Sequence, residues 1–429
     1  MRARRARHLF LLILFTLAAL PASPAWAQGK KPYRQVLIST DLNMNVDTFM
    51  TARQAIASRY AVPECPTPWT VRKFRYFGGK QEQSYVIWID NGKLQIGVVA
   101  TRGLGVLAVL MDGVQVLGWK SPVKDVVYPS LIDLKSRGGL GWLEGFNEWL
   151  CRCGMEWNGQ PGTDRFINNR GEEDTMELTL HGRVANLPAQ EVWLIAEHDP
   201  PYKITLRGVV HERLFNGPNL ELTSEFSINP GARDFRVSDA ITNCGGRRQE
   251  FQMLYHTNFG TPILEEGARF VAPVQEVTPF NERAAQDVKT YDVYSGPKPG
   301  FIEQTYAVKP LADQAGRTVV LIQNKRADLG ASVRYDTREL PYLTLWKNTA
   351  ALEDGYVTAI EPATNYPNNR RIERKYGRVP ELSPGESYYM TLDFAVLAGK
   401  TEVDQVAQEI SKLQGNRKPI LNEKPMPKE

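Results

Sequence analysis

The chain has 429 residues, of which 23% are charged, and a formal net charge of +4. Four arginines among the first seven residues account for that charge, so the remainder is nearly neutral. This balance gives no electrostatic support for binding nucleic acid or an anionic membrane. The length is sufficient for one large β-domain with a sizeable core.

The first 27 residues have the composition of a secretory signal peptide. A basic start is followed by an apolar run over residues 9–20 and by an Ala-Trp-Ala site at 25–27. Cleavage there would leave Gln28 first. The apolar run is short for a membrane span, and no later segment is long and apolar enough. We therefore expect an exported protein, periplasmic or extracellular, without a membrane span after signal cleavage.

Residues 28–84 are interpreted as an N-terminal extension that is partly helical. Helix formers and apolar residues at helical spacing occupy residues 46–60, and three prolines between residues 63 and 68 end the pattern. We expect this extension to pack against the main domain.

From Tyr85 onward the pattern changes to short strands. Asn91-Gly92 and Asp112-Gly113 each separate two apolar runs, which is a strong hairpin signal. Further strand-like runs cover 176–180, 191–196, 202–211, 219–228, 233–241, 250–259, 318–323, 331–335, 342–346 and 387–396. Many short strands with few helical stretches predict an all-β fold, a large antiparallel sandwich over residues 85–400.

The C-terminal region is predicted to form a short helix followed by a tail. Thr401 and Asp404 have capping-box spacing, and Val403, Val406, Ile410 and Leu413 share one helical face. The helix is expected over residues 401–414, with Gly415 as its stop. Residues 415–429, rich in lysine, proline and glutamate, are expected to be disordered.

The four cysteines are expected to be mostly buried thiols. An exported chain can form disulfides, and their pairing stays open. Cys151 and Cys153 alternate along a possible strand, a spacing that suits neither a zinc C-x-x-C site nor an easy disulfide.

Two histidines and one glutamate are the main candidates for chemistry. Glu361 ends an apolar run and precedes a proline, which holds its backbone extended. His181 follows a strand, and His256 lies in or at the end of another. The set fits a 2-His-1-carboxylate metal site or general acid–base catalysis. Hydrogen-bonded core histidines and a salt-bridged glutamate account for the same pattern. His198 and His211 are expected in a solvated loop and on an exposed sheet face.

Three motifs in this order, residues 180–183, 254–260 and 360–365, resemble the aldose 1-epimerase (galactose mutarotase) superfamily. Residues 138–149, 266–273 and 345–348 are similar to its largely uncharacterised bacterial branch. The resemblance covers about residues 85–398. It implies a β-supersandwich with a carbohydrate cleft for a mono- or oligosaccharide, and it implies no metal and no cofactor.

The same resemblance implies roles for the three candidates. Glu361 matches the general base, His256 the general acid, and His181 a second histidine that holds the sugar near its ring oxygen. Thr-Asn-Phe-Gly after His256 and Pro-Ala-Thr after Glu361 differ from the better-known mutarotases, and these departures leave the sugar, and with it the reaction, open.

Supporting residues are candidates for sugar binding, and each also has a structural explanation: Arg102, Asn258, Trp346, Lys347 and Asn365. Two other functions remain possible on such a scaffold, because fold does not fix function. One is sugar binding without turnover. The other is a glycoside hydrolase or lyase, in which Glu148 or Glu266 would supply the second carboxylate of a hydrolase. The oligomeric state is not indicated.

Overall fold

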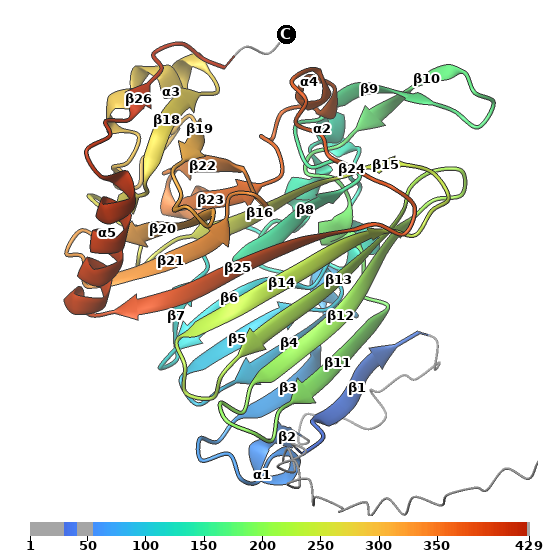
Figure 1. The fold of residues 1–429 in the computed structure, drawn as a ribbon, viewed down its shortest axis with the longest axis vertical. Coiled ribbons are helices and arrows are strands. Elements are labelled where there is room, and N and C mark those ends of the chain that lie inside the picture. The colour runs from blue at the N-terminus through green and yellow to red at the C-terminus, as the bar shows by residue number, and fades with distance from the viewer. Residues whose placement is uncertain (1–29, 41–54, 427–429) are drawn as a thin grey trace, which may run out of the picture.

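Two large, mainly antiparallel sheets form the two layers of the molecule (Figure 1). The computed structural model describes residues 30–40 and 55–426. The first sheet has nine strands in the order β1 (Tyr33–Ser39), β11 (Glu191–Ala196), β12 (Ile204–Arg213), β13 (Asn219–Ile228), β14 (Asp234–Asn243), β25 (Ser387–Ala398), β21 (Leu329–Asp336), β20 (Arg317–Gln323) and β17 (Arg269–Val271). This arrangement confirms the predicted antiparallel β-sandwich.

The second sheet has thirteen strands and carries the candidate residues. Its order is β2 (Ile56–Ala57), β3 (Thr70–Arg75), β4 (Tyr85–Asp90), β5 (Leu94–Val99), β6 (Gly105–Met111), β8 (Leu150–Met155), β16 (Gln252–Phe259), β23 (Val357–Ala363), β22 (Tyr342–Asn348), β19 (Gln304–Pro310), β18 (Val274–Pro279) and β26 (Ile420–Leu421), with β7 (Val114–Leu117) paired to β6.

Smaller elements connect and flank the sheets. Two short ribbons pair β9 (Gly162–Ile167) with β10 (Glu173–Leu178) and β15 (Gln249–Glu250) with β24 (Glu381–Leu382). The α-helices are α1 (Ser58–Ala61), α2 (Ser136–Gly139), α3 (Glu282–Gln286), α4 (Arg370–Lys375) and α5 (Lys400–Gln414). Short 3₁₀ turns include η4 (Gly141–Gly145) and η7 (Leu352–Asp354).

The predicted hairpins form at the Asn-Gly and Asp-Gly pairs. Asn91 turns the chain between β4 and β5, and its side-chain oxygen accepts hydrogen bonds from the backbone N–H groups of Lys93 and Leu94. Gly92 has φ +88°, a conformation that glycine adopts without strain. Asp112 and Gly113 also have positive φ between β6 and β7.

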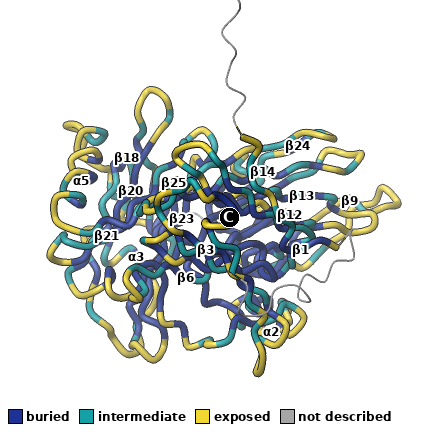
Figure 2. Tube along the Cα trace, turned by 90° about the horizontal axis from the view of Figure 1, so that it is seen from below, coloured by how far each residue is buried: buried dark blue, intermediate teal, exposed yellow. Residues whose placement is uncertain are grey.

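The main core lies between the two sheets, where the trace is mostly buried (Figure 2). In β13 buried and more exposed residues alternate along much of the strand, as expected for a sheet with one face covered. Trp149 of the second sheet packs its ring 5.0 Å from Phe394 and 5.6 Å from Phe235 of the first sheet. Aromatic packing therefore joins the layers beneath the candidate residues.

A buried ion pair also crosses between the layers. Arg152 of β8 donates from Nε to Asp239 of β14 at 2.5 Å, and both side chains are almost fully buried. Tyr255 of β16 donates its hydroxyl to the same carboxylate at 2.9 Å. These contacts turn Arg152 and Tyr255 inward, so their neighbours in the chain face outward.

The C-terminal region differs in detail from the prediction. Helix α5 has Gly399 as its N-cap, so Thr401 lies inside the helix and the predicted capping box does not form. Glu402 instead accepts a hydrogen bond from the backbone N–H of Ala398. Val403, Val406 and Ile410 are buried, and Gly415 is the C-cap as predicted.

The tail predicted to be disordered instead adds a short strand. Ile420 and Leu421 pair in parallel with β18, and Asn422 donates its side-chain amide to Glu276 and Thr278. The prediction was wrong because it rested on the polar composition of the tail and did not consider the apolar pair Ile420 and Leu421.

The cysteines agree only in part with the prediction of mostly buried thiols. All four are free; Cys151 and Cys153 are buried, and Cys65 is half-buried. Cys244 is exposed, because it lies in the turn that follows β14.

Parts of the N-terminal extension belong to the sheets, since β1 pairs with β11 and β3 pairs with β4. The predicted signal peptide and most of the helix predicted over residues 46–60 lie outside the described residues. Within the described ranges, no helix combines the length and hydrophobicity that crossing a membrane requires.

Replacing Arg152 with methionine is expected to lower the free energy of unfolding by about 3–5 kcal/mol, because the Asp239 carboxylate is left buried without its cation. Urea titration measures the change. The matched control is Arg236→Met, which breaks the exposed pair with Asp393 and is expected to lose at most about 1 kcal/mol. Equal losses in the two variants would contradict the structural role of the buried pair.

Candidate functional site

Strand register brings His256 and Glu361 together. β16 and β23 are antiparallel, with Leu254 opposite Ala363 and Thr257 opposite Ile360. The same register sets His256 opposite Glu361, and the imidazole Nε2 lies 3.3 Å from the carboxyl Oε1. Two of the predicted residues, far apart in the chain, are therefore direct neighbours.

The pair belongs to a row of side chains on the outward face of the second sheet. Cys151 of β8 is the register partner of His256, and Thr344 of β22 is the partner of Glu361. The buried Thr344 hydroxyl has no hydrogen-bond partner among the described residues. Ala359 and Ala363 precede and follow Glu361 on the same face of β23, so the side chains flanking the carboxylate are small.

Aromatic side chains cover the pair. The ring centroid of His256 lies 5.2 Å from that of Phe146, 5.6 Å from Trp346 and 5.9 Å from Trp142. These residues belong to an apolar cluster separate from the main core. The two buried groups thus lie in a site with apolar walls.

The glycine-rich segment around η4 carries two of these aromatic residues. A Cβ at Gly141 would lie 1.7 Å from the carbonyl oxygen of Asp133, and one at Gly145 would lie 2.4 Å from Arg102 Nη1. Only glycine allows such close approach of the backbone. The glycines therefore allow Trp142 and Phe146 to pack down onto the sheet.

Asn258 determines which nitrogen of His256 carries the proton. The amide nitrogen of Asn258 donates to the carbonyls of Glu148 and His256, so its oxygen is free to accept. That oxygen lies 2.7 Å from His256 Nδ1, which therefore donates to it. In the neutral imidazole, the lone pair of Nε2 then faces Glu361.

Burial shifts both members of the pair toward their uncharged forms. It raises the pKa of Glu361 well above its usual value, and the Glu303 carboxylate adds to that shift. Burial lowers the pKa of His256 well below its usual value, with the neighbouring His181 adding to the effect. Both shifts favour a pair that holds one proton and carries no net charge.

His181 joins the pair from a tight turn. Its φ is +60°, and Gly182 follows at +70°, where a Cβ would lie 2.1 Å from the Trp157 carbonyl oxygen. The His181 ring centroid lies 5.3 Å from that of His256. Its Nδ1 donates to the Asn158 carbonyl at 2.9 Å, so Nε2 is an acceptor. Burial lowers the pKa of His181 to about 4, and the ring is neutral at physiological pH.

The remaining predicted residues fall into two groups. Asn258 and Trp346 contact His256. Arg102 is buried in an ion pair with Glu148, at 2.5 Å, and also donates to Asn186. The geometry therefore supports a structural salt bridge for Arg102 and not a role in sugar binding.

Lys347 and Asn365 do not contact the pair either. Lys347 donates to the backbone carbonyls of Tyr291 and Val293, and burial lowers its pKa to about 8. Asn365 exchanges side-chain hydrogen bonds with Asn158, whose carbonyl holds His181. Asn365 thus supports the turn that carries the second histidine.

Sequence reasoning missed Thr344, Phe146 and Glu303. Thr344 and Trp346 are two residues apart on β22, so strand alternation could have assigned both to one face. Glu303 accepts a hydrogen bond from Trp346 Nε1 at 2.9 Å. Nothing in its local sequence marked this glutamate.

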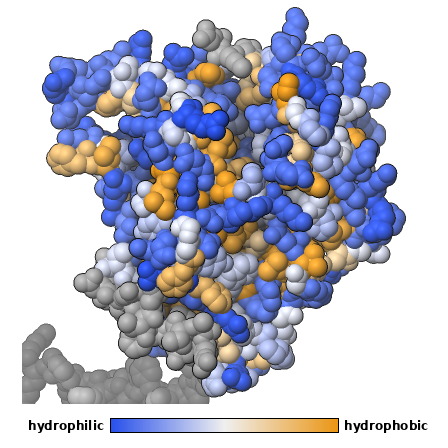
Figure 3. Space-filling model, turned by 180° about the vertical axis from the view of Figure 1, so that it is seen from behind, coloured by the Kyte–Doolittle hydropathy of each residue, from blue (hydrophilic) through white to orange (hydrophobic). Residues whose placement is uncertain are grey.

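His256 and Glu361 are only 4% and 2% exposed, so among the described residues the cleft that the resemblance implies is not open at the pair. Apolar side chains do reach the surface in patches near the middle of the back face (Figure 3). A cavity of about 750 Å³ lies elsewhere, and its lining residues include Glu156, Arg370 and Arg374.

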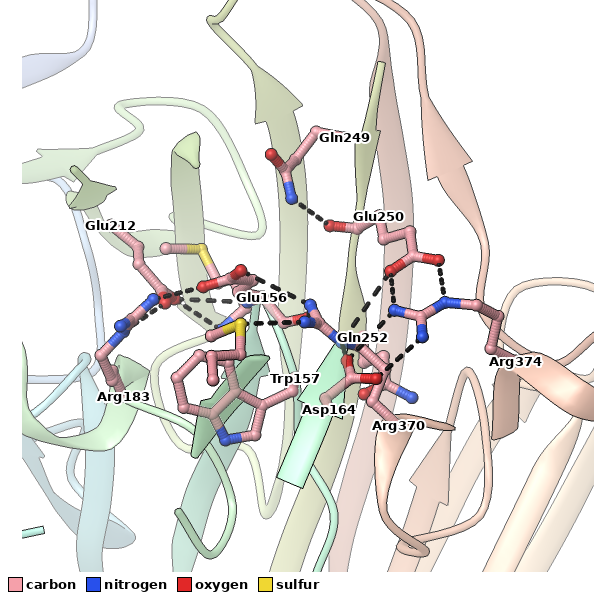
Figure 4. Close-up of polar contacts among 12 residues, drawn as sticks. Glu156, Trp157, Asp164, Arg183, Glu212, Gln249, Glu250, Gln252, Arg370 and Arg374 are labelled. Atoms are coloured by element: carbon pink, nitrogen blue, oxygen red, sulfur yellow. Dashed lines mark hydrogen bonds and ion pairs between the residues drawn. The ribbon is translucent and has the colours of Figure 1, made fainter. Parts of the chain in front are cut away.

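Ion pairs stabilise the wall of that cavity (Figure 4). Arg370 donates to Asp164 at 2.7 Å, Arg374 bridges Asp164 and Glu250, and Arg183 bridges Glu156 and Glu212. The cluster ties α4 and the β9–β10 ribbon to the end of the sandwich. It is separate from the pair, and its arginines are already neutralised.

The metal-site alternative has no geometric support. Among the described residues, no group of three or more histidine, cysteine, aspartate or glutamate side chains is arranged to hold a metal ion. His198 and His211 lie elsewhere, half-buried beside Glu64 and Glu221 respectively.

The chain is similar to proteins of the mutarotase-like fold. Residues 81–396 match the family described as a domain of unknown function (DUF4432). The crystal structure of a candidate aldose 1-epimerase from Klebsiella pneumoniae has 40% sequence identity and a TM-score of 0.85, covering 93% of this chain and 100% of that one. No curated protein matches.

More distant structures share the fold alone. A galactose mutarotase-like protein from Clostridium acetobutylicum has 15% identity and a TM-score of 0.50, covering 76% of this chain and 98% of its own. A galactose mutarotase related enzyme from Lactobacillus acidophilus has 14% identity and a TM-score of 0.50, covering 74% and 99%.

The lowered pKa of His181 predicts a loss of stability in mild acid. The unfolded chain protonates this histidine near pH 6.5, whereas the folded protein does so near pH 4. Stability therefore falls as the pH drops through this range, by about 2 kcal/mol at pH 5. Urea titrations at pH 7 and pH 5 should show a smaller fall in the free energy of unfolding for His181→Gln than for the wild type. An unchanged pH dependence in the variant would contradict the assignment.

Proposed function

We propose that this chain, which belongs to the DUF4432 branch of the aldose 1-epimerase-like superfamily, interconverts the anomers of a sugar by acid–base ring opening. One observation carries the proposal: a buried histidine and a buried glutamate lie 3.3 Å apart in an aromatic-walled site. Perturbed titratable groups at such a position are typical of catalytic sites.

The spacing of the two groups matches the two oxygens that exchange protons in the reaction. The anomeric hydroxyl oxygen and the ring oxygen are both bonded to C1 of a sugar, so they reach adjacent protein groups together. With the shared proton on His256, Glu361 is a carboxylate and removes the proton of the anomeric hydroxyl. His256 donates its proton to the ring oxygen as the C1–O5 bond breaks.

Ring closure reverses these steps. The open-chain aldehyde rotates about its C1–C2 bond, and the ring oxygen then attacks the other face of C1. His256 recovers the proton of that hydroxyl, and Glu361 returns a proton to the carbonyl oxygen. The pair ends the cycle with the one proton that it held at the start, so no net acid or base is consumed.

The surrounding residues support orientation. The neutral His181 offers Nε2 as an acceptor for a sugar hydroxyl. The role predicted for His181 beside the ring oxygen would instead require a hydrogen-bond donor. Trp346 and Phe146 offer apolar faces to the C–H groups of a sugar ring. The near-complete burial of the pair means that these aromatic side chains must move aside as a sugar enters.

The hydrolase alternative loses the two glutamates that the sequence offered for it. A hydrolase needs a second carboxylate beside the first. Glu148 is buried in its ion pair with Arg102, and Glu266 lies exposed in the turn after β16. If a sugar binds but its anomers do not exchange faster than spontaneously, the protein is a sugar-binding protein without turnover.

We also propose that the protein is exported, because residues 1–27 have the composition of a signal peptide.

Glu361→Gln and His256→Ala are each expected to lower anomer exchange at least about 100-fold, since each removes one of the two proton-transfer groups. Saturation-transfer NMR over a panel of aldoses measures exchange, corrected for the spontaneous rate. Glu353→Gln, an exposed glutamate of η7, is the matched control and should retain the wild-type rate. Exchange that survives both active-site changes would overturn the mechanism.

Asn258→Leu is expected to lower kcat about 10-fold or more with little change in KM. The substitution removes the acceptor of His256 Nδ1–H, and the imidazole is then free to adopt the other tautomer. Initial-rate kinetics on the best aldose separate the two parameters. A rise in KM with unchanged kcat would instead assign Asn258 to sugar binding.

A further inference from the structure

We propose that Glu303 is the specificity-determining residue of this site and selects neutral or amino sugars over acidic ones. This inference rests on the proposed function and names its substrate class. It concerns a carboxylate outside the acid–base pair, which the mechanism above does not use.

Strand alternation assigns Glu303 to the face of the sheet that carries the pair. Thr305 and Ala307 of β19 are the register partners of Trp346 and Thr344. Trp346 and Thr344 lie on the same face as Glu361, because Thr344 is opposite Glu361 in β23. Glu303 lies just before β19, two residues ahead of Thr305, and its hydrogen bond with Trp346 holds its side chain on the same side.

Trp346 holds this carboxylate beside the site. Its indole Nε1–H donates to Glu303 Oε2 at 2.9 Å, and its ring centroid lies 5.6 Å from that of His256. One tryptophan therefore borders the acid–base pair and fixes Glu303. No cation pairs with Glu303 among the described residues, and the residue is exposed, so its negative charge is available to a ligand.

The field of Glu303 reaches the reacting groups, because its carboxylate adds to the raised pKa of Glu361. A second anion at the same place, brought by a uronate or a sugar phosphate, would meet the same repulsion. A neutral sugar can instead donate hydroxyl hydrogens to the free carboxylate oxygen, and an amino sugar can form an ion pair with it.

The two cations among the residues predicted to bind sugar, Arg102 and Lys347, are engaged elsewhere. Arg102 is buried and neutralised by Glu148. Lys347 follows Trp346 in the strand, points to the other side, and donates to the carbonyls of Tyr291 and Val293. Neither is positioned to offset the charge of Glu303.

The test compares matched sugars: glucose with glucuronate, and galactose with galacturonate, with glucosamine as the cationic member. Saturation-transfer NMR gives the enhancement of anomer exchange over the spontaneous rate. The wild-type enhancement for each neutral sugar is expected to be at least about 10-fold that for its acid. A ratio of one or below would overturn the selection by Glu303 while leaving the proposed function intact.

Variants isolate the charge. Glu303→Gln keeps an oxygen that can accept from the Trp346 N–H. It should lower the ratio of the exchange enhancement for the neutral sugar to that for its acid by about 5-fold or more. Glu303→Lys should favour the acids. Glu303→Gln should also shift the alkaline limb of the exchange pH profile to lower pH, since the pKa of Glu361, which governs loss of the proton held by the pair, falls. Glu353→Gln is the control and should leave both measurements unchanged.

Binding distinguishes failure of this inference from failure of the proposed function. If no sugar exchanges, saturation-transfer difference NMR with methyl glucoside and methyl glucuronate, which cannot open their rings, measures selection alone. Preferential binding of the neutral glycoside, reduced in Glu303→Gln, would sustain the role of Glu303 in a binding protein. Equal binding of both, or binding of neither, would overturn it.

Discussion

The position of His256 depends on a carboxylate buried on the other side of its own sheet. Asp239 accepts hydrogen bonds from Arg152 of β8 and Tyr255 of β16, and so it sets the inward face of both strands. Because side chains alternate, Cys151 and His256 then face outward. A slip of one residue would turn the imidazole of His256 into the main core and expose Tyr255.

The second sheet consequently has a buried cluster on each of its two faces. Its inner face packs against the first sheet in the large core, with Trp149 among aromatic rings. Its outer face buries titratable groups beneath a separate aromatic cluster. The inner packing supplies the rigidity that lets the outer face hold a glutamate and two histidines without neutralising cations. Burial there raises the pKa of Glu361 and lowers the pKa of His256, and so favours the uncharged form of both groups.

Much of the fold was predictable because its signals are local. Asn91-Gly92 forces a turn whatever surrounds it, and β4 and β5 follow from the alternation on either side. The supporting residues were harder to assign. Arg102 and Lys347 are cations in suggestive motifs, but their partners, Glu148 and the carbonyls of Tyr291 and Val293, come from other elements. The tail likewise formed β26 because β18 offered a free edge.

By itself the sequence determined the antiparallel architecture, the identity of the two histidines and the glutamate, and the resemblance that relates them to sugar chemistry. The architecture follows from periodicity and turn residues, which act over a few neighbours in the chain, whereas the link to sugar chemistry is what the resemblance of the motifs implies. Only the tertiary structure decided that His256 and Glu361 touch, that Asn258 selects the tautomer, and that Glu303 stands beside Trp346. Those relations depend on inter-strand register and on burial, and both are properties of the whole folded sheet.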